Sequence, residues 1–129
     1  MKCNEVYEAA MAHIGIAPYV PENVDYDRRA PYILCAVCYE LSHADIVYRE
    51  AMGETKTERW EGLELPLSSD FPLSSRFCVP AAFCLASSLV ANEDAKLSDE
   101  LYMRFSKSMK DIYSEIPASV NKTVNIYFK

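Results

Sequence analysis

The segment Ala95–Glu115, with the sequence AKLSDELYMRFSKSMKDIYSE, carries the clearest helical pattern of the chain. Apolar side chains recur in it about every four residues, and mostly polar or charged side chains stand between them. This spacing puts the apolar residues on one face of an α-helix, which Pro117 ends. The residues of this face are Leu97, Leu101, Phe105, Met109, Ile112 and Ile116. The sequence therefore predicts an amphipathic helix that packs on other elements through one side.

Three earlier segments carry the same helical pattern. We expect a short helix over 4–14, a long helix over about 24–52 and a third helix over 76–91. Gly15 and Gly53 follow the first two helices directly, where glycine commonly ends a helix. Together with 95–115, these segments predict a domain of four helices.

The starts of the first two helices carry specific signals. Asn4 is a residue type that caps helix N-termini, so we assign it as the N-cap of the first helix. Pro31 falls within the first two turns of the long helix, which therefore either begins near Ala30 or bends at the proline. The apolar positions of the long helix are Ile33, Leu34, Val37, Cys38, Leu41, Ala44, Ile46 and Val47.

Two segments lack a helical pattern. Residues 54–75 contain Gly62, two prolines and several serines, which predicts a loop of about twenty residues; loops of that length usually protrude or serve a function. The last ten residues, 120–129, alternate between two faces like a β-strand. The predicted fold class is mainly α: a four-helix domain over 1–116, with a long loop at about 54–75 and an extended C-terminal arm over 117–129.

Length and composition limit the classes of protein. A chain of 129 residues, half of them hydrophobic, can bury a core of its own. Its apolar runs are too short to span a bilayer, and the N-terminus lacks the pattern of a secretion signal, so we expect no membrane association and synthesis in the cytoplasm. The net charge of −6 argues against tight nucleic-acid binding. Five scattered cysteines favour free, buried thiols.

The clearest candidate for chemistry is Cys35-Ala36-Val37-Cys38 with His43 five residues on. This spacing occurs in zinc and redox sites. Both cysteines, however, fall inside a predicted helix among core residues, where buried thiols serve as small hydrophobes. We therefore expect no catalytic residues, no metal and no cofactor, and keep a small metal or thiol enzyme as a third hypothesis.

Contacts with other chains are the better supported expectation. Trp60 lies in the long loop between charged neighbours, where it either anchors an interface or folds back over the domain. We predict one contact surface from Trp60, Leu63 and Leu65. A second comes from the C-terminal arm, whose strand needs a partner: either residues 63–67 of its own chain or another chain. Its contact residues are Val124, Ile126, Tyr127 and Phe128.

The order of these features resembles a known family. A long helix that opens with Tyr26-Asp27-Arg28-Arg29-Ala30 is followed by the segment Leu63-Glu64-Leu65-Pro66-Leu67. A small-residue helix around Val79-Pro80-Ala81-Ala82 comes next, and the break Asn92-Glu93-Asp94-Ala95 precedes the last helix. The chain resembles the head-tail connector, or adaptor, proteins of the neck of tailed phages and prophages.

The resemblance implies a structural protein without enzymatic activity. Such a protein forms a ring, commonly of twelve copies, below the portal protein, extends the DNA channel and docks the next neck or tail protein. Double-stranded DNA would pass without sequence-specific binding, and the protein would be assembled in the bacterial cytoplasm and end in the neck of the virion. The alternative is a small cytoplasmic helical adaptor or regulatory protein with no virion role.

Overall fold

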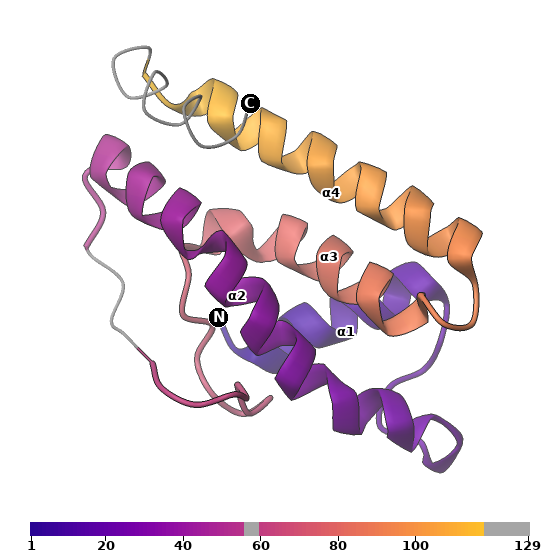
Figure 1. Ribbon diagram of the computed structural model, residues 1–129. Helices are drawn as coiled ribbons and strands as arrows, with labels where there is room; N and C mark the ends of the chain where they lie inside the picture. Colours follow the sequence, from indigo (N-terminus) through magenta and orange to yellow (C-terminus); the bar gives the residue numbers. More distant parts are fainter. Residues whose placement is uncertain (56–59, 118–129) are drawn as a thin grey trace.

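The computed structural model describes residues 1–55 and 60–117, and this part of the chain is mainly helical (Figure 1). Its four α-helices are α1 (Cys3–Ile14), α2 (Val24–Met52), α3 (Cys78–Val90) and α4 (Ala95–Glu115), with 3₁₀ turns at Pro21–Asn23 and Ser75–Phe77. The predicted four-helix fold class is confirmed. The C-terminal arm lies outside the described residues from 118 onward.

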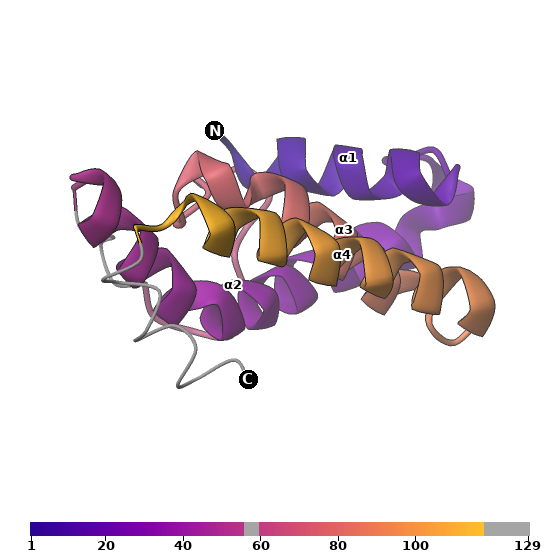
Figure 2. The ribbon, with the colours of Figure 1, turned by 90° about the horizontal axis from the view of Figure 1, so that it is seen from above.

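Helix α3 is the centre of the fold. The other three helices all pack on it, and Figures 1 and 2 show it enclosed between them. Small side chains, among them Ala81, Ala82 and Ala86, are fully or almost fully buried and let the neighbouring helices approach closely. Ser87 and Ser98 exchange hydrogen bonds between α3 and α4, because each hydroxyl donates to the other residue's carbonyl, at 2.8 and 2.9 Å. Helix α3 begins at Cys78, two residues later than predicted, because residues 75–77 form a tighter 3₁₀ turn.

Helix α4 has the bounds that its apolar pattern predicts. Asp94 caps its first turn by accepting the backbone N–H of Leu97 at 3.0 Å. Leu101, Met109 and Ile112 are buried along the face that meets α3, while Leu97 and Phe105 are half-buried. Local periodicity and capping therefore suffice to define this helix.

Helix α1 begins one residue before the predicted cap. The side chain of Asn4 does not cap the helix; its amide donates to Glu8 at 3.0 Å instead. The first helical N–H groups are satisfied by the long loop, because Cys3 donates to the carbonyl of Ser69 at 2.9 Å and Asn4 donates to that of Leu67 at 2.8 Å. The assignment of Asn4 as N-cap is therefore wrong.

Helix α2 begins at Val24 and continues through Pro31, so a start near Ala30 is also wrong. Asp25 and Asp27 in the first turn favour the earlier start, because acidic side chains stabilise helix N-termini. The carbonyl of Pro31 accepts the backbone N–H of Leu65 at 3.0 Å, which ties the loop to this helix. Gly53 ends α2 in the left-handed conformation, with φ at +69°.

The long loop packs on the domain. Leu65, Phe71 and Leu73 are buried in the core, and Phe71 donates its N–H to the carbonyl of Met1 at 2.9 Å. The described residues contain no β-strand, only one bridge between Lys2 and Asp70. Instead of pairing as a strand, residues 65–71 form backbone hydrogen bonds with the N-terminus and with α2. Within the described residues, every helix is too short or too polar to cross a lipid bilayer.

Candidate protein-contact surface on helix α2

The outer side of α2 exposes large apolar side chains. Tyr32, Tyr39 and Ile46 are 54%, 44% and 51% exposed. They are spaced by seven residues, and Ala36 between them is also exposed. At about 100° per residue this spacing places all four in one narrow stripe along the helix. We call Tyr32, Ala36, Tyr39 and Ile46 the α2 stripe.

The sequence pattern alone does not separate the stripe from the buried side of α2. The sequence gives Ile46 only as one of the apolar positions of the long helix, and in the structure half of its surface is in contact with solvent. The buried side of α2 consists of other apolar residues, including Leu34, Cys38 and Leu41, so this helix is apolar on two sides. The spacing of seven residues between the two tyrosines and Ile46 is the signal that distinguishes the second side.

The loop extends this surface on one flank. The ring of Trp60 stacks on that of Tyr39, with centroids 4.9 Å apart and planes at 27°. The hydroxyl of Tyr39 donates to the carbonyl of Gly62 at 3.1 Å, and the thiol of Cys35 donates to the same oxygen at 3.7 Å. Leu63, the next residue, is 82% exposed. Gly62 therefore holds an exposed leucine beside the α2 stripe.

The three loop residues predicted as one contact surface have different environments. Trp60 is folded back over α2, which was one of its two expected positions, and its indole N–H is buried without a hydrogen-bond partner among the described residues. Leu63 is available to a partner. Leu65 is only 5% exposed, so its apolar area is covered within its own chain and it does not share a surface with Leu63. Val124, Ile126, Tyr127 and Phe128 lie outside the described residues.

Polar contacts fix the N-terminal end of α2. The hydroxyl of Tyr7 on α1 donates to Asp27, and that of Tyr26 donates to Glu93 in the α3–α4 turn. Burial, together with the Glu93 carboxylate, raises the pKa of Tyr26 to about 12. The guanidinium of Arg29 donates to the carbonyl of Leu89 at 3.0 Å. These contacts fix how α2 lies against α1 and α3.

The C-terminal half of α2 is tied to the end of the loop. Asp45 is fully buried and pairs with Arg49 one turn later, at 3.0 Å between Oδ2 and Nε. It also accepts the backbone N–H of Ser74 at 2.7 Å. The Ser74 hydroxyl in turn donates to Glu54 at 3.0 Å. Both ends of α2 are thus fixed, and the stripe between them is presented on a rigid helix.

The cysteines behave as core residues. Cys3, Cys35, Cys38 and Cys84 are buried. Burial raises the pKa of the Cys84 thiol to about 11 and that of Cys38 still further, which opposes formation of the reactive thiolate. Among the described residues, no three His, Cys, Asp or Glu side chains gather closely enough to hold a metal ion.

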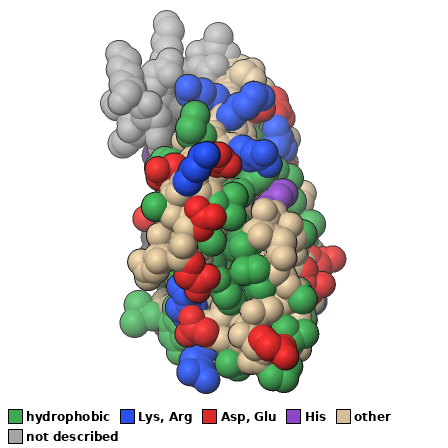
Figure 3. Space-filling model, turned by 90° about the vertical axis from the view of Figure 1, so that its right-hand side faces the viewer, with side chains coloured by type: hydrophobic (Ala, Val, Ile, Leu, Met, Phe, Trp, Pro, Cys, Tyr) green, Lys and Arg blue, Asp and Glu red, His purple; other side chains and the backbone are tan. Residues whose placement is uncertain are grey.

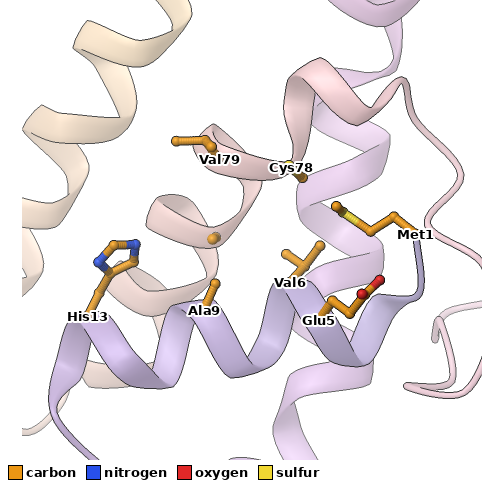
Figure 4. A pocket seen from close by; sticks show the side chains of 8 residues that line it. Met1, Glu5, Val6, Ala9, His13, Cys78 and Val79 are labelled. Carbon is orange, nitrogen blue, oxygen red and sulfur yellow. The ribbon is translucent and has the colours of Figure 1, made fainter.

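A shallow groove between α1 and α3 is a second candidate surface. Its volume is about 140 Å³, and its apolar lining includes Val6 and Ala9 of α1 and Val79 of α3 (Figure 4). His13 stacks on Phe83 of α3, with ring centroids 4.5 Å apart, and partial burial lowers its pKa. The groove is small and mostly apolar, which suits one side chain of a partner better than a polar substrate.

The end of the molecule that faces right in Figure 1 has a more mixed surface of apolar and charged side chains than the α2 stripe. Figure 3 shows hydrophobic side chains exposed there between acidic ones. Tyr19 and Val24, on either side of the first 3₁₀ turn, are each about half exposed. They do not form a regular pattern along a single helix.

Comparisons with protein-family models, curated proteins and solved structures find no match to this chain.

Proposed function

We propose that this protein is a non-enzymatic structural subunit that works by binding other protein chains. The observation that carries the proposal is the α2 stripe, where two tyrosines and an isoleucine are about half exposed on a helix fixed at both ends. Tyrosine is enriched at protein interfaces, and an ordered row of apolar side chains in water is typical of a surface that a partner covers. Leu63 adds apolar area on one flank.

The particular assembly that we propose is the neck of a tailed phage or prophage, with this chain as a head-to-tail connector. The support is the order of sequence features that resembles that family, together with the helical domain that such proteins require. The net charge of −6 suits a channel through which DNA slides without sticking, since like charges repel the phosphate backbone. In this role the chain forms a ring that contacts the portal protein and the next neck or tail protein.

The test begins with the genes that neighbour this one. The connector role requires a portal gene nearby, and the purified portal ring should bind this protein in a layer visible by negative-stain electron microscopy. We expect Ile46→Lys to weaken this binding, because a charged side chain replaces apolar area in the contact. Met103→Lys is the matched control, since Met103 is 70% exposed on α4, away from the stripe.

A genome without portal, capsid or tail genes around this one would contradict the connector role and favour the cytoplasmic adaptor. Equal portal binding by wild type, Ile46→Lys and Met103→Lys would instead show that the α2 stripe is not the contact surface. Failure of wild type to bind any form of the portal would remove the proposed docking altogether.

A further inference from the structure

The α2 stripe has the spacing of a helix-pairing seam. From Tyr32 to Ile46 the four residues of the stripe follow steps of four, three and seven. Two helices that pack along a shared seam use the same alternation of three and four residues. His43, half-buried, stands at the one missing step between Tyr39 and Ile46. A second helix is therefore the shape that fits this surface.

Two charged residues of opposite sign lie on α2 beyond the two ends of the stripe. Arg28 lies eleven residues before Tyr39 and Glu50 eleven residues after it, and both are exposed. At about 100° per residue both fall within the angular width of the stripe. Neither takes part in an ion pair in the part of the chain that the structure describes.

We propose that the α2 stripe pairs with the same stripe of a second copy, with the two helices antiparallel and a two-fold axis at Tyr39. This inference rests on the proposed function, because it takes the outer side of α2 to be a contact surface. It names a second copy as the partner of the free protein, which the portal ring would displace from the same surface. Across the axis Tyr39 meets its own counterpart, Tyr32 meets Ile46, and Arg28 meets Glu50 at both ends. A two-fold contact of this kind uses one patch on both copies.

Charge selects the antiparallel arrangement. A parallel, in-register pair would set Arg28 beside Arg28 and Glu50 beside Glu50, and like charges in contact oppose association. The antiparallel pair replaces both repulsions with attractions. The symmetric position of the two charges about Tyr39 makes the register unique as well as the direction.

The small area of the α2 stripe limits the affinity of the pair. From Arg28 to Glu50 the helix is about 33 Å long, and a strip of about 10 Å width along it covers roughly 330 Å² in projection. Standard interfaces bury about 800 Å² per partner, so even with Leu63 on the flank we expect a weak pair, with a dissociation constant of about 100 µM. Because a two-fold pair is closed, the ring of the proposed function would form through other surfaces.

The test is sedimentation velocity of the full chain over about 10 µM to 1 mM, a range that spans the expected constant. Wild type should pass from monomer to dimer. Arg28→Glu and Glu50→Arg should each raise the dissociation constant by about tenfold, because the two-fold axis repeats each repulsion at both ends. The double variant Arg28→Glu/Glu50→Arg restores both attractions and should recover wild-type association.

Lys110→Glu is the control for net charge, since Lys110 is exposed on α4 and the substitution changes charge by the same amount as Arg28→Glu. It should leave the dissociation constant unchanged. A chain that stays monomeric up to 1 mM, or a dimer equally affected by Lys110→Glu and Arg28→Glu, would overturn the pairing. A monomer that still binds the portal ring through Ile46 would assign the stripe to that partner, so the connector role would survive while the self-pairing would not.

Discussion

The carboxylate of Asp45 accepts the backbone N–H of Ser74 at 2.7 Å, although the two residues are 29 positions apart. Asp45 is fully buried, and Arg49 is its ion-pair partner on the same helix. A buried charge of this kind is tolerated only when its partners are complete. The contact therefore makes the C-terminal half of α2 and the end of the long loop depend on each other.

Replacing Asp45 should destabilise the protein strongly. Asp45→Ala leaves the Arg49 guanidinium and the Ser74 N–H without this acceptor, and we expect the free energy of unfolding to fall by about 3 kcal/mol. Asp45→Asn keeps one oxygen acceptor and should cost clearly less. Urea unfolding followed by circular dichroism measures both, and a loss below about 0.5 kcal/mol for Asp45→Ala would contradict the role of this contact.

Leu63 and Leu65 form a matched pair for the long loop. Leu65→Ala removes a core side chain that is 5% exposed and should cost about 2–4 kcal/mol in urea unfolding. Leu63→Ala removes a side chain that is 82% exposed and should change stability by less than about 0.5 kcal/mol. Equal costs for the two substitutions would show that the loop does not pack as described.

The ion pair between Arg76 and Glu115 should make stability depend on pH. Arg76 lowers the pKa of Glu115 below its usual range. The folded state therefore gains stability above the ordinary pKa of a glutamate and loses it as the pH falls through the lowered value. Because both side chains are about one-third exposed, we expect Glu115→Gln to cost only about 0.5 kcal/mol at pH 7.

In unfolding experiments this cost should shrink toward zero when the pH is brought from 7 to below the lowered pKa of Glu115, since the wild-type carboxyl then becomes protonated. Asp111→Asn is the comparison variant, because the Lys107–Asp111 pair is more exposed and should contribute less. A cost for Glu115→Gln that is the same at both pH values would rule out the charge as its cause.

Thiol labelling tests the assignment of the cysteines to the core. In the native protein at pH 8, Cys78 should react with a disulfide reagent well before the others, because it is only half-buried while Cys3, Cys35, Cys38 and Cys84 are buried. Burial and raised pKa values keep Cys38 and Cys84 protonated and inaccessible. Cys78→Ser should remove the fast phase. Fast labelling of Cys35 or Cys38 would revive the hypothesis of a thiol or metal enzyme.

Local signals account for what the sequence predicted. The bounds of α4 follow from its apolar period, Asp94 and Pro117, and the end of α2 follows from Gly53, because all of these act within one or two turns. The start of α1, by contrast, depends on contacts with a distant part of the chain. Its first N–H groups bond to carbonyls of Leu67 and Ser69, more than sixty residues away, which no local pattern reveals.

The contact surface was only partly predictable for the same reason. Leu63 and Leu65 alternate in one segment, and the choice of which is buried depends on the bond from Leu65 to the carbonyl of Pro31. The position of Trp60 depends on its stacking against Tyr39. The α2 stripe could not be predicted because apolar residues occur on two sides of the helix. Only the packing of α2 on α3 determines which side belongs to the core.

The methyl resonance of Ile46, followed by NMR while a partner is added, shows directly whether the outer side of α2 binds another chain. Ile46 is 51% exposed in the stripe, whereas Ile112 is fully buried and serves as the internal reference. We expect the Ile46 resonance to shift or broaden as the protein itself is concentrated, or as the portal protein is added, while the Ile112 resonance stays in place. An Ile46 resonance unchanged in both titrations would contradict the claim that the outer side of α2 binds another chain.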